Sequence, residues 1–131
     1  MIGLDTNVLV RYIMQDDVKQ SAKATKVIES LTVNTPGYVS LVAMVELSWV
    51  LSVSYGLTRD QVAQAIDALL RTKEIVVESK DSILKALRVF NTSSADFADC
   101  LIAQCAVIAG CSKTMTFDVG AAKVAGMTLI Q

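Results

Sequence analysis

Five short apolar segments alternate with longer segments of helical periodicity along this chain of 131 residues. We expect strands at residues 2–4, 38–39, 74–78, 113–117 and 127–130. Between them, apolar residues recur at three- and four-residue spacing, which indicates helices. Strands that are joined through helices run parallel and form a sheet with both faces covered. The sequence therefore predicts an α/β fold, and the absence of a long linker or repeat predicts a single domain over residues 1–131.

Composition excludes several classes of function. The chain has no His, which removes Ser-His and Cys-His catalysis and imidazole metal sites. Lys and Arg number 12 and Asp and Glu number 13, so no basic excess marks a nucleic-acid partner. The three cysteines match no C-x-x-C unit, and we expect a reduced, cytoplasmic protein with these residues in the core.

One apolar segment, residues 38–56, has the length of a membrane span. Glu46 lies near its centre, and no Lys or Arg flanks it closely. A buried helix of a globular protein explains this composition better, so we expect no membrane association. The position of Glu46 on the most apolar helix then calls for an explanation.

Acidic residues follow the predicted strands. Asp5 and Asp118 come directly after the first and fourth strands, Glu46 lies in the helix after the second strand, and Asp99 lies in the helix before the fourth. Ligands of parallel sheets gather at the carboxyl ends of the strands. We therefore expect these four carboxylates to meet at one edge of the sheet.

Taken singly, most of these acids have a simpler explanation. Asp5, Asp96 and Asp99 fit helix starts, where Asp caps the helix or interacts favourably with its dipole. Asp118 fits a turn. Glu46 differs, because its neighbours are apolar and predict that it is buried without a basic partner. An unpaired buried carboxylate costs several kcal/mol, so we expect a cation beside it.

Together, the acids predict a metal site. Carboxylates that gather without basic residues repel one another unless a divalent cation is present. Ligands that are all oxygen atoms favour Mg²⁺ or Mn²⁺ over Zn²⁺. Such sites suit phosphoryl chemistry, in which an ion activates water and stabilises the leaving oxygen.

Four short motifs occur in order along the chain. The first strand ends in DTN at Asp5, Glu46 lies on the long apolar helix, a later helix carries DCLIA from Asp99, and a strand ends in TFD at Asp118. In these motifs the sequence resembles PIN-domain proteins, most closely the VapC-like toxin ribonucleases of type II toxin–antitoxin pairs. The resemblance covers nearly the whole chain.

The resemblance implies a three-layer α/β/α sandwich around a central parallel sheet of four or five short strands. It also implies a metal-dependent endoribonuclease, in which a metal-activated water hydrolyses a phosphodiester of RNA. Asp5 and Asp99 would be the primary ligands of one or two Mg²⁺ or Mn²⁺ ions, and Glu46 and Asp118 would complete the catalytic set.

Further residues receive roles from the same resemblance. Asn7 and Thr116 would orient the ligands. Asp96 lies on the helix face of Asp99, and it either joins the acids or only begins the helix. Arg11 is the basic residue nearest to Asp5 in the sequence and is the candidate for steering the RNA phosphate. The implied partners are a second copy of the chain, in a homodimer, and an antitoxin protein.

Two other functions stay open. A non-catalytic PIN-like module would bind metal or a partner without cleaving RNA. A phosphoacceptor signalling domain shares the size, the sheet class and an acidic Mg²⁺ site. It needs an acceptor Asp at the end of the third strand, where this chain has Glu78, and a Lys after the last strand, which here runs into Gln131.

Overall fold

The computed structural model describes residues 1–131 and divides them into two compact units, Met1–Glu78 and Ser79–Gln131. Both units combine parallel strands with helices, which confirms the predicted α/β class. No helix is long and apolar enough to span a membrane. Each unit is described below by itself, as unit 1 and unit 2.

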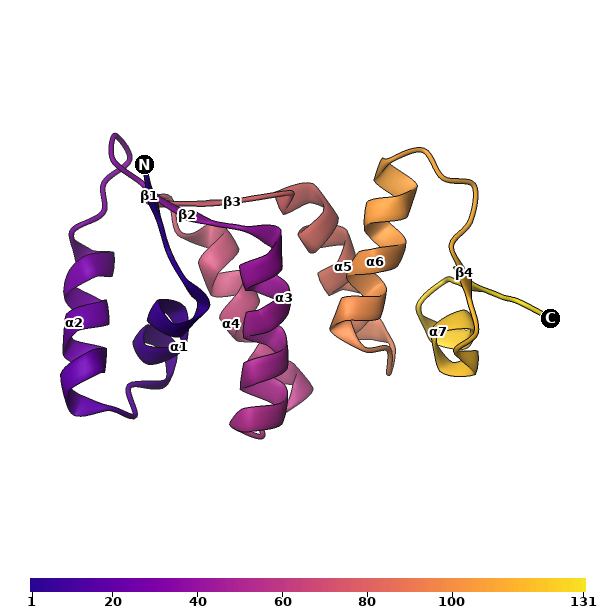
Figure 1. The fold of residues 1–131 in the computed structure, drawn as a ribbon, viewed down its shortest axis with the longest axis horizontal. Helices are drawn as coiled ribbons and strands as arrows, with labels where there is room; N and C mark the ends of the chain where they lie inside the picture. Colours follow the sequence, from indigo (N-terminus) through magenta and orange to yellow (C-terminus); the bar gives the residue numbers. More distant parts are fainter. The chain divides into compact units, whose positions relative to one another are not determined.

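Unit 1 contains a three-stranded parallel sheet in the order β1-β2-β3 (Figure 1). Its strands are β1 (Ile2–Gly3), β2 (Gly37–Val39) and β3 (Ile75–Val77). Gly3, Tyr38 and Val76 are paired across the sheet. Because all three strands point the same way, their carboxyl ends lie along one edge, as the sequence predicts.

Helices connect these strands in unit 1. They are α1 (Thr6–Met14), α2 (Val18–Glu29), α3 (Leu41–Trp49), the π-helix η1 (Val50–Ser54) and α4 (Arg59–Arg71). The helices α1 and α2 pack against each other, and α3 contacts α1 and α4 and continues into η1. The apolar segment of residues 38–56 forms a helix that changes its winding after Trp49, and the sequence pattern did not predict this change.

The core of unit 1 lies between the sheet and the helices. Val39 and Val77 are the last paired residues of β2 and β3, Leu4 directly follows β1, and all three are buried. Gly37 of β2 is also buried, and a Cβ atom there would come within 2.8 Å of Leu31 and 2.9 Å of Leu4. The middle strand therefore needs a glycine at this position, since those two leucines occupy the space of a side chain.

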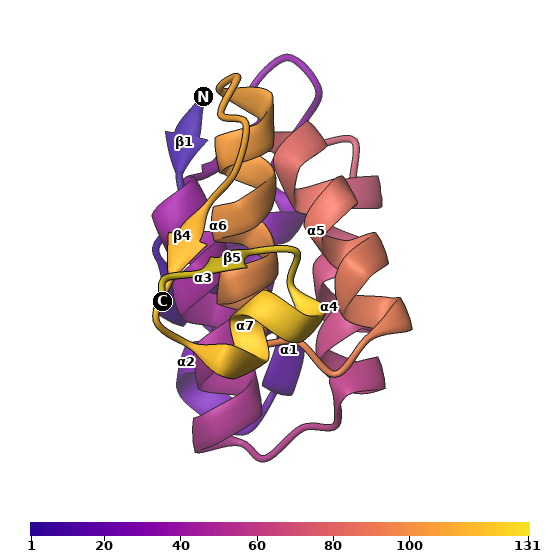
Figure 2. The same cartoon turned by 90° about the vertical axis from the view of Figure 1, so that its right-hand side faces the viewer.

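Unit 2 consists of a helix pair followed by a small parallel sheet (Figure 2). Its elements are α5 (Lys80–Thr92), α6 (Phe97–Ile108), β4 (Met115–Thr116), α7 (Val119–Val124) and β5 (Thr128–Leu129). The rings of Phe90 and Phe97 meet edge to face, with centroids 5.6 Å apart, across the junction of α5 and α6. Burial of these rings and of Ile83, Leu87 and Leu101 forms the core of the unit.

Several details differ from the expectations. All five strands form, but they lie in two sheets of three and two strands rather than in one. Each strand is only two or three residues long, since only two or three residues of each are paired with a neighbouring strand. Cys100 is buried as expected, whereas Cys111 is exposed because it follows the end of α6.

Candidate active site

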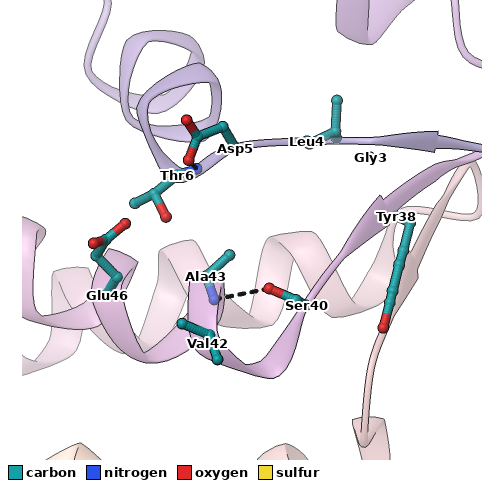
Figure 3. Close-up of a pocket in the computed structure, with 9 residues that line it drawn as sticks. All are labelled: Gly3, Leu4, Asp5, Thr6, Tyr38, Ser40, Val42, Ala43 and Glu46. Atoms are coloured by element: carbon teal, nitrogen blue, oxygen red, sulfur yellow. Dashed lines mark hydrogen bonds between the residues drawn. The ribbon is translucent and has the colours of Figure 1, made fainter.

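A pocket of about 410 Å³ lies at the carboxyl ends of β1 and β2 in unit 1 (Figure 3). Its walls come from the end of β1, the start of α1, the end of β2 and the first half of α3. The lining residues are Gly3, Leu4, Asp5, Thr6, Tyr38, Ser40, Val42, Ala43 and Glu46. Two of the predicted metal ligands, Asp5 and Glu46, thus share one pocket that no Lys or Arg lines.

Asp5 begins the first helix as well as lining the pocket. Its backbone is extended, and its Oδ1 accepts a hydrogen bond of 2.7 Å from the amide of Thr6. The simpler expectation, that Asp5 caps a helix, is therefore confirmed. Capping leaves the second carboxylate oxygen of Asp5 without a protein partner, so the cap and a metal ligand are compatible.

Glu46 is exposed, and the expectation that it is buried is wrong. The core side of α3 is formed by Ala43, Met44 and Leu47, and Glu46 lies on the other side of the helix with Val42, which is 77% exposed. The apolar neighbours of Glu46 in sequence therefore do not surround it in space. Its carboxylate is not buried and therefore needs no cation to compensate for burial. Figure 3 shows that Glu46 lines the pocket close to the start of α1.

Glu78 is a residue at this edge that the sequence did not assign to the site. It follows β3, and its Oε1 accepts a hydrogen bond of 2.7 Å from the amide of Leu41 at the start of α3. The hydroxyl of Ser40 accepts a second bond, of 3.1 Å, from the amide of Ala43. The sequence contained a signal for Glu78, because this acid comes at the end of the third predicted strand and Asp5 comes directly after the first.

The other predicted acids belong to unit 2. Asp96 begins α6, and its Oδ1 accepts a bond of 3.2 Å from the amide of Asp99. Burial raises the pKa of Asp99 above its ordinary value of 3.8, and the charges of Asp96 and Asp118 raise it further. The charges of Asp96 and Asp118 are thus near enough to Asp99 to disfavour its ionised form. Asp96 begins the helix, as one of the two expectations has it, and its membership of the acidic site stays a prediction.

Asp118 and Thr116 are held by a local hydrogen-bond pattern. The amide of Asp118 donates a bond of 3.0 Å to the hydroxyl of Thr116, and Asp118 Oδ1 accepts one of 3.1 Å from Ala121 at the start of α7. Thr116 therefore fixes the backbone of the acid it was expected to orient. The second carboxylate oxygen of Asp118 has no protein partner and is free for a ligand.

Two further predicted residues lie outside the pocket of unit 1. Asn7 is exposed on α1 and does not line it. Arg11 pairs with Asp16 at 3.1 Å, and its guanidinium also donates to Gln20 at 2.7 Å and to the hydroxyl of Tyr55 at 3.0 Å. The steering role of Arg11 stays a prediction, but these three bonds already hold the side chain.

The residues present fit an oxygen-coordinated divalent cation by their chemistry. Neither unit by itself holds three His, Cys, Asp or Glu side chains in a metal-binding arrangement. Burial raises the pKa of Asp99, the charges of Asp96 and Asp118 raise it further, and no salt bridge neutralises these three carboxylates. A divalent ion relieves such repulsion, and carboxylate oxygens favour Mg²⁺ or Mn²⁺.

Comparison with known families decides what kind of domain this is. The sequence model of the PIN domain matches residues 2–127, which is nearly the whole chain. The chain belongs to the PIN domain family. No curated protein matches it closely enough to count as a relative.

PIN domains are typically nucleases, hydrolases that act on nucleic acids, and PIN nucleases generally use divalent metal ions. The family membership confirms the resemblance to PIN domains, whereas the resemblance to VapC-like toxins stays a prediction. The membership agrees with the α/β fold and with a pocket that contains acids but no bases. The meeting of all four acids around one ion stays a prediction, because Asp5 and Glu46 belong to unit 1 and Asp99 and Asp118 to unit 2.

Proposed function

We propose that this PIN domain is a metal-dependent endoribonuclease and the toxin of a VapC-like toxin–antitoxin pair. The observation that carries the proposal is the pocket of unit 1, where Asp5 and Glu46 lie at the carboxyl ends of parallel strands without a basic residue. Ligands bind at this edge of parallel sheets. Two carboxylates there, in a family of nucleases, favour metal-assisted hydrolysis over a binding role alone.

The proposal assigns four acids to metal-dependent cleavage of RNA by a single functional domain of residues 1–131. Asp5 and Asp99 would hold Mg²⁺ or Mn²⁺, and Glu46 and Asp118 would complete the set. A bound ion would supply the activation of water and the stabilisation of the leaving oxygen. Thr116 keeps the backbone of Asp118 in place, and the helix caps formed by Asp5 and Asp118 each leave one carboxylate oxygen for the ion.

Cleavage of single-stranded RNA by the purified full chain tests the proposal. We expect cleavage with Mn²⁺, none with EDTA, and a loss of at least a hundredfold in Asp5→Asn and in Asp99→Asn. The matched control is Asp17→Asn, because Asp17 also caps a helix with its carboxylate but does not line the pocket of unit 1. Equal cleavage by wild type and both site variants would mean that the activity is a contaminant. Mn²⁺ binding without cleavage would favour the non-catalytic module.

The toxin role has its own test, in cells. Induced expression of the wild type should arrest growth, whereas Asp5→Asn should not. Co-expression of the protein encoded by the adjacent gene should restore growth if that protein is the antitoxin. Arrest by Asp5→Asn to the same extent as by the wild type would contradict a toxin that acts by cleaving RNA.

An exposed apolar stripe supports a protein partner, either a second copy or the antitoxin. Val42 on α3, Trp49 at its end and Val53 in η1 are 77%, 59% and 60% exposed. Trp49 is the single tryptophan of the chain, so its fluorescence reports this stripe alone. We expect a blue shift of its emission as protein concentration rises through dimer formation. An unchanged spectrum in a sample that sedimentation shows to be dimeric would exclude the stripe from the interface.

A further inference from the structure

We propose that Glu78 is a positioning residue for the pocket of unit 1, a role that rests on the proposed nuclease function. Glu78 follows β3, whereas Asp5 follows β1 and Glu46 lies on α3. Its Oε1 accepts the 2.7 Å bond from the amide of Leu41, the first residue of α3. Glu78 thereby ties the end of the third strand to the helix that carries one of the two pocket carboxylates.

The start of α3 depends on two side-chain acceptors. The first amides of a helix have no partner within the helix and need an acceptor from outside. Ser40 accepts the bond from Ala43, and Glu78 accepts the bond from Leu41. A charged acceptor makes a shorter and stronger bond, and a negative charge at a helix start also interacts favourably with the dipole. Without Glu78, the first amide of α3 loses its protein partner.

The turn that Glu78 holds is also a wall of the pocket. Ser40, Val42 and Ala43 surround Leu41 in the sequence, and all three line the pocket. Glu78 itself does not line it. The carboxylate therefore acts through the backbone of Leu41 and is no ligand in the pocket. A shift of this turn moves the wall that faces Asp5 and the helix that carries Glu46.

Two substitutions separate the hydrogen bond from the charge. Glu78→Gln keeps an oxygen acceptor of the same length and removes the charge, whereas Glu78→Ala removes both. If the bond to Leu41 is what matters, Glu78→Gln should bind Mn²⁺ as the wild type does. Glu78→Ala should bind it about tenfold more weakly, because groups that orient a metal site typically affect affinity by that much or more.

The measurement is a calorimetric titration of the full chain with Mn²⁺, combined with amide hydrogen exchange at Leu41. We expect faster exchange at Leu41 and weaker Mn²⁺ binding in Glu78→Ala, and wild-type values for both in Glu78→Gln. Asp17→Ala is the matched control, since it removes the carboxylate that accepts a 2.8 Å bond at the start of α2. It should lower the thermal stability to a similar degree and leave Mn²⁺ affinity unchanged.

Each other outcome decides against the role of Glu78. Unchanged Mn²⁺ affinity in Glu78→Ala, together with faster exchange at Leu41, would show that the bond only stabilises the helix. An equal loss of affinity in Asp17→Ala would show a general effect of weaker folding. Weak binding by Glu78→Gln would show that the charge acts directly. A wild type that binds no Mn²⁺ would overturn the proposed function itself, and the role of Glu78 with it.

Discussion

At the scale of single residues, the acids of this chain serve structure and chemistry together. Asp5, Asp96 and Asp118 each begin a helix with one carboxylate oxygen. This explains why each of them looks ordinary by itself in the sequence. Asp99 is the exception, because burial and two neighbouring carboxylates disfavour its charge.

Asp99→Asn should raise the thermal midpoint at neutral pH in EDTA. The pKa of Asp99 is raised in the folded protein, so its stabilising effect is present below its ordinary pKa of 3.8 and is lost as the pH rises through the folded value. At pH 7 the charged carboxylate therefore destabilises the fold. We expect a rise of a few degrees at pH 7, measured by thermal denaturation, and little difference at pH 3.

A helix-dipole effect works in the opposite direction and needs a control. Asp99 lies in the first turn of α6, where a negative charge is worth about 0.3–1 kcal/mol. Asp60 lies in the first turn of α4, so Asp60→Asn measures the dipole effect in the same buffer. An Asp99→Asn midpoint that falls as far as that of Asp60→Asn would argue against repulsion among the three carboxylates.

Ser21 offers a stability prediction unrelated to the site. Its hydroxyl is buried in α2 and has no hydrogen-bond partner. Ser21→Ala removes this unpaired group and introduces the residue of highest helix propensity, so we expect stabilisation by about 1 kcal/mol in urea denaturation. A destabilised Ser21→Ala would mean that the hydroxyl has a partner, such as a bound water.

At this scale, the sequence predicts which acids line the pocket better than it predicts their burial and their hydrogen-bond partners. Asp5 and Glu46 share the pocket as expected, since strand ends meet at one edge of a parallel sheet. The burial of Glu46 was predicted wrongly, because a run of apolar residues does not reveal which side of a helix faces solvent. The bond of Glu78 could not be predicted, since Leu41 lies 37 residues away.

At the scale of elements, capping residues set the helix bounds that the sequence predicts best. Helix α4 spans Arg59–Arg71, and a reciprocal pair of bonds between Thr58 and Gln61 fixes its start. Strand ends are predicted less well, since they depend on partners far away in the sequence. The π-helix η1 has no local signature in the sequence, so its winding was not predicted.

Tyr55→Phe should loosen the contact between the α1–α2 turn and the end of η1. The hydroxyl of Tyr55 donates a bond of 2.7 Å to Asp16 and accepts one of 3.0 Å from Arg11. The bond from Tyr55 and the charge of Arg11 hold the pKa of Asp16 below its ordinary value of 3.8. The stability that this group contributes is therefore present above pH 3.8 and is lost as the pH falls below it.

Thermal denaturation between pH 2 and pH 7 checks this prediction. We expect the midpoint of Tyr55→Phe to lie below that of the wild type at pH 7 and to approach it in acid. Tyr12→Phe is the matched control. The side chain of Gln15 bonds to the backbone carbonyl of Tyr12 and not to its hydroxyl, so the substitution removes no such bond. A constant difference across the pH range would show that Tyr55 acts by packing and not through Asp16.

At the scale of the whole molecule, metal binding should stabilise the folded chain. A ligand that binds only the folded protein stabilises it by about 2.7 kcal/mol at a concentration one hundred times its dissociation constant. We expect Mn²⁺ to raise the thermal midpoint of the wild type and EDTA to reverse the rise. Asp5→Asn and Asp99→Asn should each remove most of this effect.

The double variant distinguishes a shared ion from two separate ions. If Asp5 and Asp99 hold the same ion, either substitution removes most of the Mn²⁺ effect, and the two together add little. If each unit binds its own ion, each substitution removes only part and the losses add. Additive losses would contradict the proposed joint site, although each unit could still bind metal.

The π-helical segment Val50–Ser54 also links the contact of Tyr55 with Asp16 to the number of residues in this part of the chain. A π-turn takes up more residues than an α-turn, and each α-helical residue turns the chain by about 100°. Deleting one residue here would restore ordinary winding and swing Tyr55 away from Asp16. Homologous chains that lack this extra residue should therefore also lack the Tyr–Asp–Arg contact, and the two traits should be gained and lost together in evolution.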